Sequence, residues 1–240
     1  TAQGMMNAVG LQGPGVEYWL DNVVPDLLAT GATVVASIWG RSVEDYRRAA
    51  EMLATAPDGV VAVEVNLSCP NLEGRGSIFA HDLELSAEVI AATEACGRPR
   101  WAKLSANTDR IIDVADAVHA AGADAVTCVN TLLGLAYDPD TLRPVLGAGG
   151  GGLSGRAIHP VAVRAVHDVH AALPHLPIIG VGGVASGWDA AEMLLAGATA
   201  VQVGTATFAD PGAPATIQRE LVDWLRARGI ARMTDVTALT

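Results

Sequence analysis

Leu28-Ala-Thr-Gly-Ala-Thr-Val-Val35 is one of three similar segments of the chain, and the others are His119-Ala-Ala-Gly-Ala-Asp-Ala-Val126 and Leu195-Ala-Gly-Ala-Thr-Ala-Val201. Each segment has the pattern of an amphipathic helix end, a Gly and an apolar strand. Gly tolerates the left-handed conformation that ends a helix. A helix, a Gly and a buried strand in repetition are typical of an α/β protein with parallel strands.

The same alternation continues along the chain. Short apolar runs predict strands covered on both faces, over 33–38, 60–66, 100–104, 125–130, 177–181 and 200–203. Amphipathic stretches predict helices over 17–29, 43–55, 83–95, 109–121, 160–173, 188–196 and 214–228. The segment that opens the chain, and a connection of roughly thirty residues after 125–130, have the composition of loops.

This succession predicts a (β/α)8 TIM barrel with about the last six βα units present in residues 1–240. We expect one barrel domain that lacks its first two units, which would lie in an N-terminal part outside this sequence. A six-stranded, open, doubly wound sheet is the alternative. The barrel is favoured because informative residues follow nearly every strand and do not gather at one switch point.

Composition excludes several classes of protein. The net charge of -11 argues against a nucleic-acid partner, whose phosphates would be repelled. Three cysteines without a close pair argue against a disulfide framework or a structural zinc site and favour a cytoplasmic setting. We see no membrane span and no signal peptide. The histidines show no metal-ligand spacing after strands, so no metal site is expected.

Polar residues are concentrated where predicted strands end, which is the edge of a barrel that carries the active site. The strand over 60–66 is followed by Asn66-Leu-Ser-Cys-Pro-Asn71. Cys69 in this loop can act as a nucleophile or a base, although a small buried apolar residue is the alternative. Lys103 ends the next strand and can stabilise negative charge on a reducible ring, unless its side chain extends to solvent. Asn130 and Thr131 follow the strand after that.

Glycine turns follow the last two predicted strands. Gly182 and Gly183 come after one strand, and Gly204 and Thr205 come after the other. Gly lets the backbone approach a phosphate and direct N–H groups toward it. Tight packing turns explain either pair alone but explain both less well. The Gly-rich run from 147 to 155 is consistent with a ligand-binding loop or with a flexible linker.

Together these motifs resemble the class 1 dihydroorotate dehydrogenase family over essentially the whole chain. Asn66-Leu-Ser-Cys-Pro-Asn71 resembles the active-site loop, and Asn7-Ala-Val-Gly-Leu11 resembles the substrate-binding loop. Further similar segments follow in family order, namely Lys103-Leu-Ser, Asn130-Thr-Leu-Leu-Gly134, Gly152-Leu-Ser-Gly155, Gly180-Val-Gly-Gly183 and Val203-Gly-Thr205. Other flavin barrels share the glycine turns, but the combination is specific.

The resemblance implies FMN-dependent oxidation of dihydroorotate to orotate in pyrimidine biosynthesis. It implies that Cys69 removes the C5 proton while C6 gives hydride to flavin N5. The substrate-binding residues it implies are Asn7, Ala8, Val9, Gly10, Leu11, Asn66, Asn130 and Thr131. The FMN-binding residues it implies are Ser37, Asn66, Lys103, Val129, Gly155, Gly182, Gly183, Gly204 and Thr205. Ser37 departs from the family, in which Asn is expected.

Within the family, the Asn130-Thr-Leu-Leu-Gly stretch and the Gly-rich run resemble subclass 1B. That subclass implies an FAD and iron–sulfur partner subunit that passes electrons to NAD, and a homodimer or heterotetramer. Fumarate is the alternative acceptor. Rival interpretations are a dihydropyrimidine dehydrogenase-like domain, a tRNA dihydrouridine synthase, a non-catalytic phosphate-binding barrel, and an inactive fragment. The acidic charge counts against the tRNA enzyme.

Overall fold

The computed structural model describes residues 3–68 and 79–236. These residues form two compact units, which are considered one at a time. Unit 1 comprises Thr1–Val9, Ser105–Asp109 and Cys128–Thr240, and unit 2 comprises Gly10–Leu104 and Arg110–Thr127. The expectation of a single domain over 1–240 stays a prediction.

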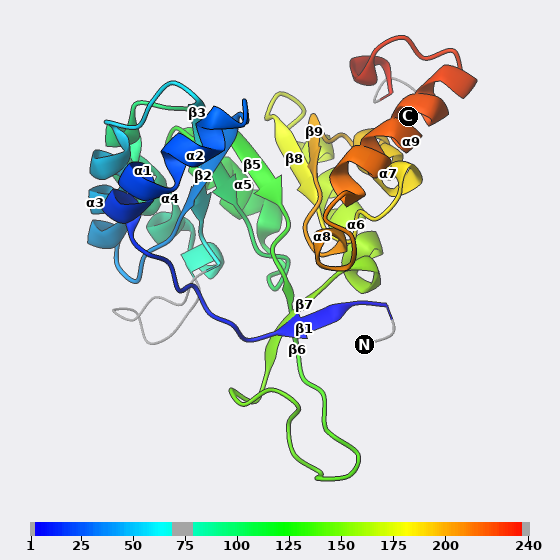
Figure 1. Cartoon of the computed structure of the whole chain (residues 1–240), viewed down its shortest axis with the longest axis horizontal. Helices are drawn as coiled ribbons and strands as arrows, with labels where there is room; N and C mark the ends of the chain where they lie inside the picture. Colours follow the sequence, from blue (N-terminus) through cyan, green and yellow to red (C-terminus); the bar gives the residue numbers. More distant parts are fainter. Residues whose placement is uncertain (1–2, 69–78, 237–240) are drawn as a thin grey trace. The chain divides into compact units, whose positions relative to one another are not determined.

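Unit 2 is built on parallel strands with helices packed beside them (Figure 1). Its strands are β2 (Val34–Ile38), β3 (Val60–Asn66), β4 (Arg100–Lys103) and the first three residues of β5 (Ala125–Cys128). Its helices are α1 (Val16–Asn22), α2 (Val24–Ala29), α3 (Val43–Leu53), α4 (Leu83–Ala92) and α5 (Ile111–Ala120), with 3-10 turns η1 (Phe79–His81) and η2 (Glu94–Cys96). Most of β3 and all of β5 are buried, as the continuous apolar runs predicted.

One predicted helix of unit 2 is wrong in extent. The helix expected over 17–29 is two helices, α1 and α2, which meet at Val23. Pro25 lies in the first turn of α2, where its missing N–H removes no hydrogen bond. In one continuous helix the same residue would lose a bond to the preceding turn, so the chain starts a new helix.

Unit 1 contains the last two parallel strands, β8 (Ile178–Val181) and β9 (Ala200–Gln202). Its helices are α6 (His159–Ala172), α7 (Gly187–Leu195), α8 (Ala206–Ala209) and α9 (Ala213–Ala227), with 3-10 turns η3 (Arg156–Ile158) and η4 (Met233–Asp235). Val129, directly after β5, donates its backbone N–H to Val181 O at 2.8 Å. This bond continues the backbone ladder from the end of β5 to β8.

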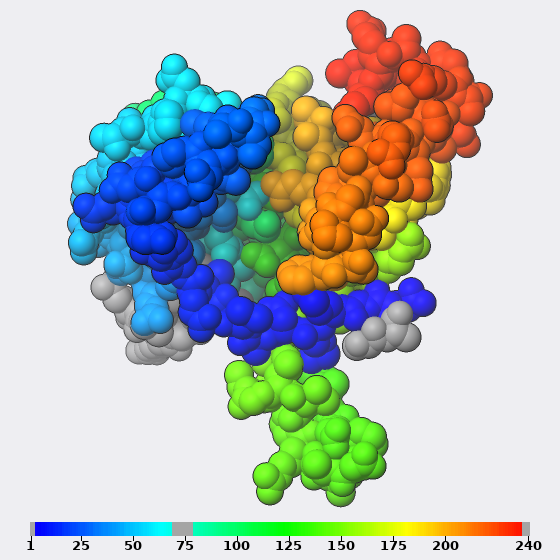
Figure 2. Space-filling view, in the orientation of Figure 1, coloured from blue at the N-terminus to red at the C-terminus, as the bar shows by residue number. Residues whose placement is uncertain are grey.

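Unit 1 also contains a small antiparallel sheet, which the loop interpretation missed. Its strands β1 (Met5–Asn7), β7 (Gly151–Ser154) and β6 (Leu132–Gly134) pair in the order β1-β7-β6. Strands of three or four residues, one of them glycine-rich, carry little local signal, and β1 pairs with residues about 145 positions away. The connection between β6 and β7 projects from this sheet as a hairpin (Figures 1 and 2).

The order of the parallel strands separates the two fold classes considered. It is β2-β3-β4-β5-β8-β9, which follows the chain without reversal. A doubly wound sheet reverses its strand order at a switch point, whereas a (β/α)8 barrel does not. The prediction of consecutive barrel units is therefore confirmed. In 3–68 and 79–236, no helix is both long and apolar enough to cross a membrane.

Candidate active site

Two predicted site residues lie side by side at the carboxyl ends of neighbouring strands in unit 2. Asn66 ends β3 and Lys103 ends β4, and the two residues are paired in the register of these parallel strands. Tyr46 donates its hydroxyl hydrogen to Asn66 O at 2.7 Å, and Asn66 Oδ1 accepts the backbone N–H of Ser68 at 3.1 Å. These bonds fix the start of the loop that follows β3. Cys69 and Asn71 lie outside the described residues.

Lys103 meets a buried carboxylate that the sequence analysis missed. Lys103 Nζ lies 3.1 Å from Glu64 Oε2, and Thr127 Oγ1 donates to Glu64 Oε1 at 2.9 Å. Glu64 is only 6% exposed. The side chain of Lys103 therefore does not simply extend to solvent. An acidic residue inside the apolar run Val60–Asn66 was the signal that could have revealed this partner.

In unit 1 the small sheet brings together residues from distant parts of the chain. Asn7 on β1 is opposite Gly152 on β7, and Asn7 Nδ2 lies 3.5 Å from Gly152 O. A Cβ added at Gly152 would collide with the Thr131 side chain, so Thr131 packs directly on this glycine. Asn7 and Thr131, two predicted substrate residues, thus lie at the same part of the sheet. Asn130 Oδ1 accepts the Thr131 N–H at 2.7 Å.

Asn107 holds this segment in place and was not singled out from the sequence. Its Nδ2 donates to Thr131 O at 2.9 Å and to Ser105 Oγ at 3.0 Å. Its Oδ1 accepts the N–H of Leu133 at 2.8 Å. A polar residue in the loop after a strand, four positions beyond Lys103, was the available signal.

The other predicted substrate residues are not brought into this group. Ala8 and Val9 are exposed in unit 1, and Gly10 and Leu11 are exposed in unit 2. Their role in binding stays a prediction.

The predicted phosphate residues of unit 1 are partly brought together. Gly155, Gly183 and Thr205 line one pocket of ≈ 180 Å³. Gly182 is not part of the lining; it is buried, and its carbonyl accepts from the His159 ring at 2.8 Å. Gly204 is exposed and also outside the lining. Helix α8, which follows Thr205, has only 4 residues, so its dipole adds little to anion binding.

The shape of this pocket depends on glycine. Gly183 has φ +72°, and a Cβ there would lie 2.7 Å from both Gly155 O and His159 Cβ. Gly155 has φ +88°, and a Cβ there would lie 3.1 Å from Gly4 Cα. A side chain at either position would strain the backbone and crowd the pocket wall. Arg156 also lines the pocket and supplies a positive charge that the sequence analysis overlooked.

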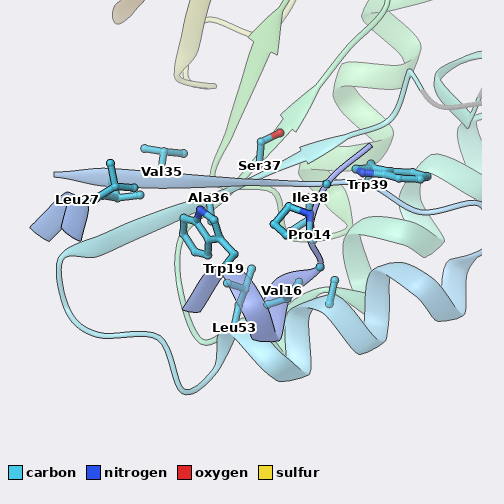
Figure 3. A pocket seen from close by; sticks show the side chains of 14 residues that line it. Pro14, Val16, Trp19, Leu27, Val35, Ala36, Ser37, Ile38, Trp39 and Leu53 are labelled. Carbon is cyan, nitrogen blue, oxygen red and sulfur yellow. The ribbon is translucent and has the colours of Figure 1, made fainter. Parts of the chain in front are cut away.

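Ser37 lies in a different pocket, of ≈ 510 Å³, in unit 2. Figure 3 shows Ser37 and Val35 on one side of β2, and Trp19 and Leu53 on the other. Val35 and Ser37 share a side because side chains alternate with a period of two along a strand, whereas Trp19 and Leu53 come from α1 and α3. The labelled lining is almost entirely apolar, which does not suit a phosphate. The contact between Ser37 and a flavin stays a prediction.

The fold and these groups define a class. Consecutive βα units of a (β/α)8 barrel carry a lysine and amide side chains at strand ends, with a glycine-lined, arginine-flanked pocket after the last strands. This arrangement is that of a (β/α)8-barrel enzyme with its polar groups at the carboxyl ends of the strands.

Comparison with known proteins identifies the family. The model of the dihydroorotate dehydrogenase family matches residues 1–225, and the chain belongs to this family. Dihydroorotate dehydrogenase B (NAD(+)), catalytic subunit, of Geobacter sulfurreducens is 43% identical over 237 residues, which are 98% of this chain and 77% of that protein. A putative dihydroorotate dehydrogenase A (fumarate) of Solibacter usitatus is 45% identical over 234 residues, 97% of this chain and 76% of that protein.

A solved structure supports the fold. The crystal structure of DHODH in complex with ferulenol from Eimeria tenella matches with a TM-score of 0.65 and 23% identity. The match covers 81% of this chain and 57% of that chain. The resemblance to dihydroorotate dehydrogenases, and to the NAD(+)-type catalytic subunit among them, is thereby confirmed.

Proposed function

We propose that the chain forms the catalytic part of an FMN-dependent dihydroorotate dehydrogenase that oxidises (S)-dihydroorotate to orotate. The family match over residues 1–225 carries this proposal. The glycine-lined pocket and the amide side chains at strand ends support it, because they suit a phosphate and a pyrimidine ring edge, respectively.

FMN would be held by the glycine-lined pocket of unit 1, and Lys103 would act on its ring. Gly155, Gly183 and Thr205 would enclose its phosphate, with Arg156 adding a charge-assisted contact. Lys103, fixed by Glu64, would hold a positive charge where the reducible ring gains electrons. Bound FMN would supply the acceptor for the two electrons that leave the substrate.

The predicted FMN contacts of Ser37, Asn66, Val129, Gly182 and Gly204 remain part of the same proposal. Gly182 would act through the turn that it forms with Gly183, since its carbonyl is engaged by His159.

The substrate would be held by amide and hydroxyl groups. Asn7 and Thr131 lie at the same part of the small sheet, and Asn130 and Asn66 each follow or end a strand. Amides offer both donors and acceptors to the edge of a pyrimidine ring. Cys69 would act as the base that removes the C5 proton, because the pKa of a thiol can be brought near neutrality.

We propose that the electrons pass to NAD through a partner subunit that contains FAD and an iron–sulfur cluster. Several similar relatives are named as the NAD(+)-type catalytic subunit, whereas the Solibacter usitatus relative is named for fumarate. The sequence has 3 cysteines, too few for a cluster of its own beside a catalytic Cys69. We propose a heterotetramer, with a homodimer as the alternative, acting in pyrimidine biosynthesis in the cytoplasm.

The visible spectrum of the purified protein tests the proposal, both for the 240-residue chain and for a chain extended to the length of its relatives. Anaerobic dihydroorotate should bleach bound flavin. Cys69→Ala should retain flavin but lose bleaching by orders of magnitude, because its base is gone. Flavin that binds but is not bleached would point to another substrate, and absence of flavin from both chains would refute the proposal.

A further inference from the structure

A cluster of one histidine and two carboxylates lies in unit 1, outside the lining of the pocket formed by Gly155, Gly183 and Thr205. It consists of His159, the first residue of α6, with Asp189 and Glu192 on α7. The ligand atoms of these three side chains all lie within 4.8 Å of one another. We propose that this cluster binds a divalent transition-metal ion such as Zn²⁺.

The hydrogen bonding of His159 determines which ring nitrogen faces the cluster as a ligand. Nδ1 lies 2.8 Å from Gly182 O, and a carbonyl can only accept, so Nδ1 carries the hydrogen. In the neutral ring, Nε2 then carries a lone pair. A backbone carbonyl that orients the second nitrogen is the usual support of a metal-binding histidine.

Nε2 of His159 faces two carboxylates but makes no hydrogen bond to either. It lies 3.3 Å from Glu192 Oε2 and 4.0 Å from Asp189 Oδ1. His159 is only 8% exposed, and Nε2 makes no hydrogen bond to any residue in 3–68 or 79–236. A lone pair facing two carboxylate oxygens is repulsive unless a proton or a metal ion lies between them. A metal ion removes this conflict for all three groups at once.

The two carboxylates are held in suitable positions. Asp189 Oδ2 accepts the N–H of Ala185 at 2.9 Å and lies 3.5 Å from Arg156, which leaves Oδ1 on the side of His159. Glu192 follows three residues later on α7, so both carboxylates are on one face of the helix. With metal–ligand distances of about 2.0–2.2 Å, two ligand atoms of one ion lie at most about 4.4 Å apart. The carboxylate oxygens, 3.3 Å and 4.0 Å from Nε2, are within that separation.

The cluster is accessible from solvent on one side. His159 and Glu192 line a pocket of ≈ 590 Å³, and the Glu192 side chain is 35% exposed. Arg164 and His167 also line this pocket, and Arg164 is paired with Asp168 at 2.6 Å. Three protein ligands with an open side leave a fourth position for water, as in zinc sites that have three protein ligands. This inference does not depend on the proposed function.

Binding of Zn²⁺ and Co²⁺ to untagged, chelator-treated protein tests the site. Calorimetry should give one equivalent of Zn²⁺, and Co²⁺ should give visible d–d bands without the intense thiolate charge-transfer band that a cysteine ligand produces. His159→Gln and Glu192→Gln should each weaken Zn²⁺ binding at least about tenfold. Glu192→Gln guards against misfolding, because this side chain is partly exposed. His167→Gln, an exposed histidine of the same pocket, is the matched control and should bind as the parent does.

Two results would overturn the proposal. The first is the absence of stoichiometric Zn²⁺ binding to the chelator-treated protein. The second is Zn²⁺ binding that is unchanged in both His159→Gln and Glu192→Gln, which would place the ion elsewhere.

Discussion

Replacing Lys103 with Met removes the cation that faces the buried Glu64 carboxylate, while nearly preserving the volume of the side chain. Glu64 would keep the hydroxyl of Thr127, 2.9 Å away, but would lose the positive charge that neutralises it. Two unit charges 3.1 Å apart attract by about 5 kcal/mol at an effective dielectric constant of about 20. Breaking a buried pair typically costs about 3–5 kcal/mol. We expect the lower end, about 3 kcal/mol, because the Lys103 side chain is 21% exposed.

The converse change should cost less. Glu64→Gln leaves Lys103 with an amide oxygen as acceptor and with partial hydration, so we expect a loss of about 1–2 kcal/mol. Arg47→Met is the control, because its ion pair with Glu44 is 3.6 Å long and its side chains are 48% and 62% exposed. An exposed pair of this kind contributes about 0–1 kcal/mol.

Urea unfolding, monitored by circular dichroism, measures all three free energies of unfolding. The double variant Glu64→Gln/Lys103→Met gives the coupling between the two side chains, which we expect to be favourable. The reasoning is refuted if Lys103→Met costs no more than Arg47→Met. It is also refuted if Glu64→Gln lowers the free energy of unfolding more than Lys103→Met does. The unpaired buried carboxylate would then not be the main cause of the destabilisation.

Three further predictions concern other parts of the chain. Gly183→Ala should weaken FMN binding at least about tenfold in a flavin fluorescence titration, because φ is +72° there and a Cβ would make 2.7 Å contacts with the pocket wall. Gly147→Ala is the control, since a Cβ there meets nothing within 4 Å, and it should bind FMN as the parent does. Asn107→Ala should lower the free energy of unfolding in urea by about 1–3 kcal/mol and raise the KM for dihydroorotate, because Thr131 O and the Leu133 N–H lose their partner. Asn22→Ala, at an exposed helix position, is the control and should change neither quantity. Burial raises the pKa of the Cys128 thiol from 9.0 to about 12, so the fold favours the protonated form. The stability that comes from keeping this thiol protonated is complete below pH 9 and is lost as the pH rises toward 12, by about 1.4 kcal/mol per pH unit. The urea midpoint should therefore fall less steeply above pH 9 in Cys128→Ala than in the parent protein. Equal slopes of midpoint against pH would contradict the burial argument.

Much of the barrel was predictable because local sequence patterns indicate its strands and helices. The strand over 60–66 was predicted with the bounds of β3, and the helix over 188–196 differs from α7 by one residue at each end. Apolar runs and the Gly that ends a helix act within a few residues, so they can be read from neighbours in the chain. The three-stranded sheet was missed because its pairing joins residues about 145 positions apart.

The strand ends that carry the candidate site were predictable, but the residues that face the pocket were not. Residues at strand ends could be chosen because parallel strands present their carboxyl ends at one edge, and Asn66 and Lys103 are indeed adjacent. Gly182 and Gly183 looked equivalent in sequence, yet only Gly183 lines the pocket. Which of two neighbouring residues faces a ligand depends on backbone direction in a turn, and composition does not specify that direction.

The sequence by itself determined the succession of strands and helices, the positions of the strand ends and the membership of the dihydroorotate dehydrogenase family. Tertiary structure alone decided which charged and polar groups meet. Lys103 contacts Glu64, which lies 39 positions earlier in the chain, and His159 faces Asp189, which belongs to another helix. Local propensities act over one or two turns of chain, whereas these encounters follow from the packing of whole elements, which brings distant side chains to within a few ångströms.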